Sequence, residues 1–389
     1  MDPRTVIPVL DRRPAPAPAR DEAPIVGSRV ELQLLTTLRC NLKCSYCSIE
    51  GGVLRTQGNV SYGMDELARF VDTHLAGLDV YVTFYGGEPT LNLPFMQAVM
   101  QRFPLFRYQL QTNGTLLDDV PPELLARFSN VLVSVDGGPQ ITDGYRGKGI
   151  YRQVMKNVDE VRDRVGGSLT ARVTWSDPAT TFEEIDGLTA HFDYVYFQFV
   201  AGEAYAPASV EARRQVLRRL VERFFAGDRL YRVVPLMGVV RNKLFPERAK
   251  EACGGRTQCR VSTHLLNVMP DGSIYPCPDL MHLPHMQQGD LRGNWLRKSP
   301  LQPHASMPCD GCEAMGFCRR NCMKNLYLAY VEDRADYRRD VTEPICELVR
   351  FLGREVERHD YRAWFASLPL AQRKELRDAE VYEYVEVMP

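Results

Sequence analysis

Three cysteines near the start of the chain, Cys40, Cys44 and Cys47, follow the spacing C-x3-C-x2-C. Three thiolates this close on one loop can hold three corners of a cubane [4Fe–4S] cluster and leave its fourth iron open. An open metal position can bind the amine and carboxylate of a small molecule. A three-thiolate zinc site is the alternative, but the nearest following histidine is the distant His74. The spacing therefore favours an iron–sulfur cluster over zinc.

Six β-like runs alternate with helical patterns around this loop, between about residues 30 and 200. The runs are rich in Val, Tyr, Phe and Leu, as buried strands are, and span residues 30–35, 80–84, 108–111, 131–135, 170–174 and 194–199. Apolar residues recur between them at helical spacing, as at Leu67, Phe70, Val71 and Leu75. Strands with helical crossovers predict a parallel sheet, either doubly wound or part of a (β/α) barrel.

Four unusual segments directly follow the first four strands of this predicted sheet. They read RCNLKCSYC, YGGEP, TNG and DGG in chain order. In parallel α/β folds the functional site lies at the carboxyl ends of the strands. We therefore expect the four segments to meet in one pocket beside the cysteine loop.

With Tyr46 before its last cysteine, the first motif resembles the C-x3-C-x-Φ-C signature of radical S-adenosylmethionine (SAM) enzymes. The resemblance implies an α/β fold, a partial (β/α)6 TIM-like barrel that carries this loop after its first strand. It also implies reductive cleavage of SAM to a 5′-deoxyadenosyl radical that abstracts a hydrogen from a substrate. The YGGEP segment resembles the GGEP motif that meets the methionine amino group in this family.

The same resemblance implies a set of cofactor contacts at the strand ends. The residues expected to contact SAM are Tyr46, Gly86, Gly87, Glu88, Gln111, Asn113, Ser134, Asp136 and Arg146. Arg146 is expected to pair with the cofactor carboxylate. The alternative for each is local, since Asn-Gly and Asp-Gly form turns and a single arginine is usually a surface residue.

Eight further cysteines lie beyond residue 250, and their order resembles the SPASM domain, which binds two auxiliary [4Fe–4S] clusters. By this resemblance, the first auxiliary cluster would use Cys253, Cys259, Cys277 and Cys322, and the second Cys309, Cys312, Cys318 and Cys346. Three clusters with these ligands account for all eleven cysteines. A pair of zinc ribbons is the alternative for the C-x2-C unit.

Asp279 is the candidate catalytic base, because anaerobic sulfatase-maturating enzymes carry a catalytic Asp directly after the corresponding cysteine. Here Pro278 separates Asp279 from Cys277, so the match is displaced by one residue. An Asp that caps a turn is the alternative.

Composition and pattern divide the chain into four parts. We expect a flexible tail over 1–28, the barrel over 29–235, a small cysteine-rich iron–sulfur domain over 236–350 and a C-terminal helical segment over 351–389.

A net charge of −1 argues against binding to nucleic acid or membrane surfaces. The arginines between 213 and 223 are expected on the solvated face of one helix. Without a long apolar run or a secretion signal, a cytoplasmic protein is predicted.

Three functions remain open from the sequence. The first is radical modification of a ribosomally made peptide or protein side chain by crosslinking, oxidation or epimerisation, with a reductant such as flavodoxin or ferredoxin. A separate leader-peptide-binding protein is a possible partner, because the first 28 residues are too few for a leader-binding module. The second is the same chemistry on a small metabolite. The third is a non-enzymatic, zinc-binding interaction protein.

Overall fold

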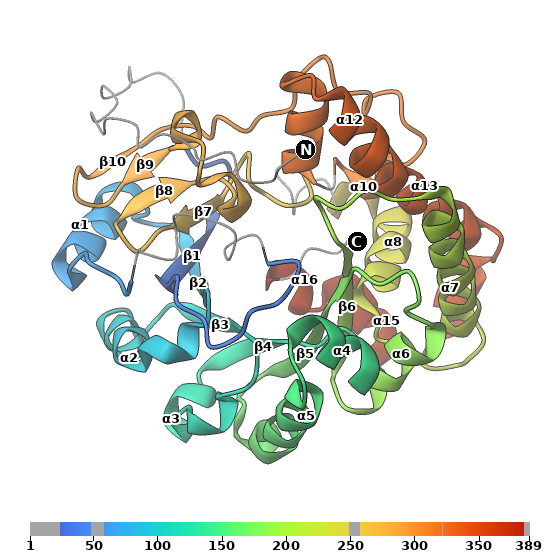
Figure 1. Ribbon diagram of the computed structural model, residues 1–389, viewed down its shortest axis with the longest axis horizontal. Coiled ribbons are helices and arrows are strands. Elements are labelled where there is room, and N and C mark those ends of the chain that lie inside the picture. Colours follow the sequence, from blue (N-terminus) through green and yellow to red (C-terminus); the bar gives the residue numbers. More distant parts are fainter. Residues whose placement is uncertain (1–23, 48–57, 249–256, 321, 385–389) are drawn as a thin grey trace.

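The computed structural model describes residues 24–47, 58–248, 257–320 and 322–384. Their centre is a sheet in the order β10-β9-β8-β7-β1-β2-β3-β4-β5-β6. The strands β1 to β6 are parallel neighbours and curve into the partial barrel of Figure 1. They are β1 (Arg29–Thr37), β2 (Asp79–Gly86), β3 (Arg107–Thr112), β4 (Phe128–Ser134), β5 (Ser168–Trp175) and β6 (Tyr194–Phe199). The predicted strands and the partial barrel are confirmed.

Helices cover the outside of this barrel, as Figure 1 shows. They are α1 (Met64–His74), α2 (Leu93–Arg102), α3 (Pro122–Leu125), α4 (Pro139–Arg146), α5 (Ile150–Val161), α6 (Phe182–Asp186), α7 (Pro207–Phe225) and α8 (Val234–Leu244). Successive strand residues point to opposite faces of a sheet, so alternate positions meet the helices. Those positions are apolar and fully buried, as at Leu34, Phe84 and Val133. Burial of this face fixes the register of each strand.

The opposite positions face the barrel interior and are mostly polar. Glu31 on β1 accepts a hydrogen bond from Thr83 on β2 at 2.6 Å, and Gln109 on β3 donates to Thr83 at 2.6 Å. Thr170 on β5 donates to Asn130 on β4 at 2.9 Å. Complete barrels of this type fill their interior with branched apolar side chains. This interior is built instead from hydrogen-bonding groups.

The cysteine-rich segment extends the barrel sheet. Its strand β7 (Leu265–Val268) pairs in parallel with β1, and β8 (Ser273–Tyr275), β9 (Gly289–Asp290) and β10 (Trp295–Leu296) continue antiparallel. The pairing of β7 with β1 joins the two cysteine-bearing regions through one continuous sheet. The cysteine loop after β1 therefore lies next to this segment in space.

Helices dominate the end of the chain, as the sequence predicts. They are α10 (Met315–Cys318), α11 (Met323–Leu326), α12 (Ala335–Tyr337), α13 (Glu343–Glu357), α14 (Tyr361–Ser367), α15 (Leu370–Asp378) and α16 (Val381–Tyr384). Helix α13 packs against α7, which links the cysteine-rich segment to the barrel. It also runs through residue 350, where the sequence places a boundary. In the part of the chain that is described, no helix combines the length and apolar character needed to span a bilayer.

The arginines of α7 depart most from the sequence expectation at Arg213, and Arg214 is only 30% exposed. Arg213 is only 2% exposed and donates to the carbonyl of Ser176 at 2.7 Å. Its guanidinium lies over the ring of Tyr205 at 4.9 Å, and burial lowers its pKa. The prediction of a solvated face is therefore wrong for Arg213, which caps the end of β5. The side chains of Arg218, Arg219 and Arg223 are 41%, 51% and 52% exposed and confirm the prediction.

Candidate functional site

The GGEP segment holds the chain that leads into the cysteine loop. The amide of Gly87 donates to the carbonyl of Thr37 at 2.9 Å, and the amide of Glu88 donates to that of Arg39 at 2.8 Å. Gly86 adopts φ +135°, and a Cβ there would lie 2.2 Å from the oxygen of Thr37. A Cβ on Gly87 would lie 2.1 Å from the oxygen of Arg39. Both glycines are required because β2 approaches the cysteine loop this closely.

The Glu88 carboxylate is buried and accepts four hydrogen bonds from within the protein. Thr90 donates through its amide at 3.0 Å and its hydroxyl at 2.7 Å, and the Thr112 hydroxyl donates at 2.8 Å. The Asn113 amide donates to the other oxygen at 2.7 Å. Burial raises the pKa of Glu88, and these hydrogen bonds oppose the rise. Its side chain joins the ends of β2 and β3, a role that the sequence motif does not reveal.

The cysteine loop lies beside the end of β3. The side-chain amide of Asn113 donates to the Cys40 sulfur at 3.7 Å and to the Asn41 side chain at 2.8 Å. Cys40 is exposed, whereas Cys44 and Cys47 are partly buried. Burial raises the pKa of Cys44 to about 11, and Arg146 opposes that rise. The three thiols lie within electrostatic range of one another, as a shared cluster requires.

A buried ion pair fixes the other side of this loop. Arg146 on α4 makes a bidentate pair with Asp136, at 2.8 and 2.9 Å, and the two side chains are 5% and 1% exposed. The hydroxyl of Tyr46 donates to Asp136 at 2.7 Å, and the amide of Thr174 donates at 3.0 Å. Burial lowers the pKa of Arg146, but the Asp136 carboxylate raises it by more, so the pKa lies above its usual value. Arg146 is thus a buried, paired cation and not an ordinary surface residue.

The remaining predicted cofactor contacts lie at the same ends of the strands. Gln111 is the next-to-last residue of β3 and pairs with Leu132, and Ser134 ends β4 opposite Arg172. Both are partly buried. The structure thus gathers the four predicted segments at one end of the barrel. Contact of these residues with SAM stays a prediction.

Two partly buried polar residues that the sequence reasoning missed occupy the barrel interior below this site. Arg172 on β5 donates to Gln198 on β6 at 2.8 Å and lies over the ring of Tyr196 at 5.3 Å. Their signal in the sequence is a polar residue at alternate positions of a strand, where an apolar filling is expected.

Tyr85, which ends the inner row of β2, lies between the two cysteine regions. Cys47, Tyr85 and Cys277 all pack against one apolar cluster that includes Leu35 and Met323. Burial raises the pKa of Tyr85 to about 12, Arg172 opposes the rise, and Asp279, Cys47 and Cys277 add to it. The tyrosine therefore lies within electrostatic range of both cysteine regions.

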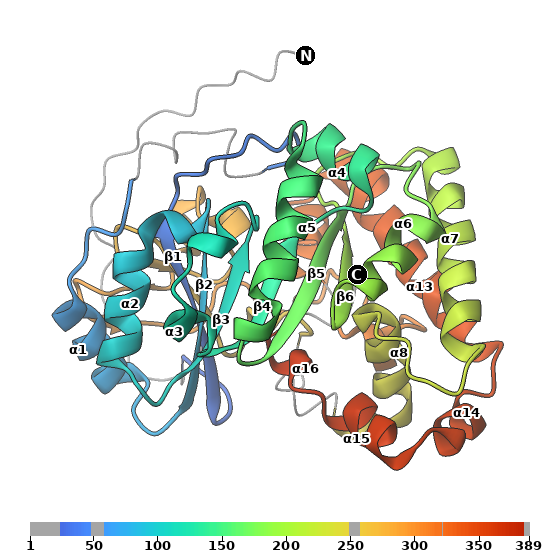
Figure 2. The same ribbon diagram turned by 90° about the horizontal axis from the view of Figure 1, so that it is seen from below.

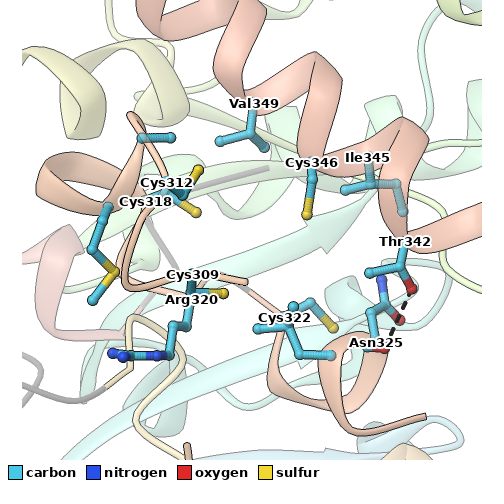
Figure 3. A pocket seen from close by; sticks show the side chains of 13 residues that line it. Cys309, Cys312, Cys318, Arg320, Cys322, Asn325, Thr342, Ile345, Cys346 and Val349 are labelled. Atoms are coloured by element: carbon cyan, nitrogen blue, oxygen red, sulfur yellow. Dashed lines mark hydrogen bonds between the residues drawn. The ribbon is translucent and has the colours of Figure 1, made fainter. Parts of the chain in front are cut away.

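Five cysteines of the cysteine-rich segment line one cavity. Cys309, Cys312, Cys318 and Cys346 line it, and Figure 3 shows their sulfur atoms directed into the same space. Ile345 and Val349 add an apolar wall from α13. These four are the set that the resemblance assigns to the second auxiliary cluster, and a cavity ringed by thiols fits such a group. Burial raises the pKa of Cys309 to about 11, opposed by Arg320.

The other auxiliary set is only partly described. Cys322 lines the same cavity and is also within electrostatic range of Cys277, so the chain passes between the two groups there. Cys259 is buried in the apolar cluster against which Cys277 packs. Cys253 lies outside the described residues. The three described members, Cys259, Cys277 and Cys322, therefore lie in one region of the structure.

Asp279 forms an ion pair beside this set. The ammonium of Lys324 donates to its carboxylate at 2.6 Å, and the side chain of Lys324 is 11% exposed and that of Asp279 36%. Although burial lowers the pKa of Lys324, Asp279 raises it above the usual value. Lys324 was not singled out from the sequence, although it follows Cys322 by two residues. Its partner Asp279 lies within electrostatic range of Tyr85.

No three His, Cys, Asp or Glu side chains within residues 24–47, 58–248, 257–320 and 322–384 come close enough to hold a single metal ion. Cys309, Cys312, Cys318 and Cys346 line one cavity, and a cubane [4Fe–4S] cluster takes four thiolates.

Residues 34–189 match the family model of the radical SAM superfamily. Mycofactocin maturase MftC of Mycobacterium tuberculosis is 23% identical over 317 residues, which are 74% of this chain and 76% of that protein. An uncharacterized protein of Archaeoglobus fulgidus is 36% identical over 126 residues, which are 32% of this chain and 30% of that protein. The solved structure of native anSMEcpe with bound AdoMet and Kp18Cys peptide is similar in fold, with a TM-score of 0.56 at 20% identity, covering 74% of this chain and 88% of that one.

Proposed function

We propose that the chain is a radical SAM enzyme that modifies a peptide or protein side chain by hydrogen abstraction. The match of residues 34–189 to the radical SAM superfamily supports this, and it implies the use of SAM and a [4Fe–4S] cluster. The observation that carries the proposal is the loop of Cys40, Cys44 and Cys47 at the carboxyl ends of six parallel strands. When bound, the cluster and SAM would supply the 5′-deoxyadenosyl radical. The protein's part is to bind and orient SAM and the substrate, and to exclude water from the site.

The chain's own residues divide this work. We assign Cys40, Cys44 and Cys47 to the cluster, and the strand ends with Asn113 and Asp136 to the SAM pocket. Arg146 would offer there the guanidinium N–H groups that Asp136 does not occupy, since Asp136 holds the guanidinium in one orientation. Gly86 and Gly87 would keep β2 close to the loop. Tyr46, Glu88, Gln111 and Ser134 complete the proposed set.

Two auxiliary [4Fe–4S] clusters are part of the proposal. The cavity of Cys309, Cys312, Cys318 and Cys346 supports one of them. Cys259, Cys277 and Cys322, with Cys253, would hold the other. Substrate oxidation also requires a proton acceptor. We assign it to Asp279, which Lys324 holds at 2.6 Å beside the proposed cluster.

A peptide substrate is supported by the relatives. The anSMEcpe structure holds the Kp18Cys peptide, and the mycobacterial relative is named a maturase. The polar barrel interior with Arg172 and Gln198 can hydrogen-bond peptide groups. We further propose a reductant such as flavodoxin or ferredoxin, a separate leader-binding protein, and a reducing, cytoplasmic setting in which the eleven cysteines do not form disulfides.

Hydrogen transfer to the cofactor tests the substrate class. Anaerobically reconstituted protein should hold about twelve irons if three four-iron clusters form. Peptides deuterated at one residue type at a time should then transfer deuterium into 5′-deoxyadenosine. Transfer from a small metabolite with none from peptides would replace the peptide proposal by the metabolite alternative. Protein that takes up zinc and no iron would contradict the whole function.

A further inference from the structure

Helix α13 carries one of the cavity-lining cysteines and, one turn later, an arginine. Cys346, Ile345 and Val349 on this helix line the cavity of Figure 3. Residues four apart on a helix share a face, so Arg350 lies on the same face as Cys346. Figure 2 shows α13 alongside α7, which covers part of this helix. The Arg350 side chain is accordingly only 31% exposed.

Arg350 shares its carboxylate partner with two other arginines. Its Nε and Nη2 donate to Glu347 at 3.1 and 3.0 Å. Arg354 on α13 donates to the same carboxylate at 2.7 Å, and Arg214 on α7 donates at 2.9 Å. A guanidinium carries five N–H groups, and Glu347 takes those of only two nitrogen atoms of Arg350. Further N–H groups of Arg350 are therefore left for other acceptors.

Two thiols of the cavity lie within reach of this guanidinium. Burial lowers the pKa of Arg350, but Glu347 raises it by more, and the Cys346 thiol and a hydrogen bond with Cys312 add to the rise. Arg350 in turn opposes the rise that burial causes in the pKa of Cys346. Cys312 comes from the loop before α10 and Cys346 from α13. One arginine thus reaches two proposed cluster ligands from separate segments.

A second arginine lines the cavity itself. The Arg320 side chain is 10% exposed, whereas that of its partner Asp310 is 78% exposed. Water and salt screen an exposed charge more than a buried one. The guanidinium of this pair therefore acts more strongly on the cavity than the carboxylate does, and it adds to the positive potential from Arg350.

We propose that Arg350 raises the reduction potential of the [4Fe–4S] cluster that Cys309, Cys312, Cys318 and Cys346 would hold. Net charge, hydrogen bonds to the sulfurs and solvent exposure set the potential of such a cluster. Reduction adds one negative charge, so a nearby guanidinium and an N–H···S hydrogen bond favour the reduced form. The cluster would then accept an electron from an oxidised substrate more readily. That the four cysteines hold a cluster rests on the proposed function.

Redox titration of the anaerobically reconstituted full chain, followed by electron paramagnetic resonance, tests this role. In Arg350→Gln the midpoint potential of this cluster should fall by about 59 mV, which is a tenfold smaller equilibrium constant for one-electron reduction. Glu347→Gln removes the negative partner of Arg350, so the midpoint should rise instead. The signal that also changes in Cys312→Ser belongs to this cluster, because that substitution alters one of its proposed ligands.

Arg354→Gln is the matched control for Arg350→Gln. Arg354 lies one turn further along α13 and pairs with Glu347 at 2.7 Å and with Glu313 at 2.6 Å. Its side chain is 44% exposed, and none of its contacts among the described residues is with a cysteine. The substitution removes a cation from the same carboxylate, and the midpoint potentials should stay as in the parent.

An unchanged midpoint in Arg350→Gln would overturn the proposal, and so would an equal fall in Arg354→Gln, which would make the effect one of overall charge on α13. If Arg350→Gln does not assemble the cluster, Glu347→Gln decides, and a midpoint at or below that of the parent overturns the proposal. A parent chain whose four cysteines hold no cluster would contradict the proposed function as well. A cluster that forms with an unchanged midpoint would contradict this inference alone.

Discussion

Single side chains at the strand ends act mainly by holding other parts of the site. Glu88 is the clearest case, because both of its oxygens accept hydrogen bonds, from Thr90 after β2 and from Thr112 and Asn113 at the end of β3. Asp136 does the same for Tyr46 and Arg146. We infer that these residues set the shape of the pocket before any cofactor enters, so their substitution should change stability as well as activity.

Glu88→Gln should lower the free energy of unfolding of the cluster-free chain by about 1–3 kcal/mol. An amide NH2 in place of either oxygen faces a donor, the Asn113 amide or the Thr90 and Thr112 groups. Urea denaturation measures the change. Glu183→Gln, at a side chain 64% exposed, is the control and should change stability much less. Equal stability of the two variants would show that the four hydrogen bonds contribute little.

Asp136→Asn should destabilise the chain by about 3–5 kcal/mol, because it leaves the Arg146 guanidinium buried without its charge partner. Tyr46→Phe removes one hydrogen bond to the same carboxylate and should cost about 1 kcal/mol. Thermal or urea unfolding compares the two. A larger effect for Tyr46→Phe would contradict the buried ion pair as the main support of the loop.

Asp279→Asn should leave SAM cleavage intact and slow formation of the modified product at least tenfold, if Asp279 accepts the substrate proton. The paired measurement is 5′-deoxyadenosine against product by mass spectrometry. Lys324→Met serves as the companion variant, since it removes the partner at 2.6 Å and keeps the carboxylate. Product formation that keeps pace with 5′-deoxyadenosine in Asp279→Asn would exclude the base assignment.

At the scale of elements, the strand ends bring together segments that the sequence separates by up to about a hundred residues. The close approach of β2 to the chain after β1 is possible only because positions 86 and 87 carry no side chain. The continuous pairing of β7 with β1 then places the cysteine-rich segment against the same loop.

Gly87→Ala should therefore reduce iron content by about four atoms of about twelve, because a Cβ 2.1 Å from the Arg39 oxygen displaces the chain before Cys40. Iron and sulfide analysis after anaerobic reconstitution gives the count. Gly144→Ala on α4 is the matched control, since its added Cβ meets no atom within 4 Å. Full iron occupancy in Gly87→Ala would show that the loop tolerates the shift.

The sequence predicted the six strands and the partial barrel because buried strands leave a strong apolar pattern. It also indicated the residues of the site, since GGEP and the cysteine spacings are local. It could not reveal that Glu88 turns into the protein, that Arg213 is buried, or that Lys324 pairs with Asp279. Each of these depends on contacts between residues far apart in the chain, which no local pattern encodes.

Across the whole molecule, the described cysteines lie in two regions, the loop after β1 and the segment from Cys259 to Cys346. Burial raises the pKa of Cys44 and Cys309 to about 11 and that of Cys277 well above its usual value. Thiols with raised pKa values hold their protons at neutral pH, so cluster assembly must release them. Iron uptake by the cluster-free chain should therefore rise steadily between about pH 7 and 9. Uptake that is independent of pH would contradict protonated ligands.

Formation of 5′-deoxyadenosine from SAM under anaerobic reducing conditions tests the central claim most directly. The reconstituted chain should produce it, and the triple variant Cys40→Ala/Cys44→Ala/Cys47→Ala should produce none while it keeps about eight irons. Persistent 5′-deoxyadenosine formation in that variant, or none in the parent chain with its clusters loaded, would contradict the account.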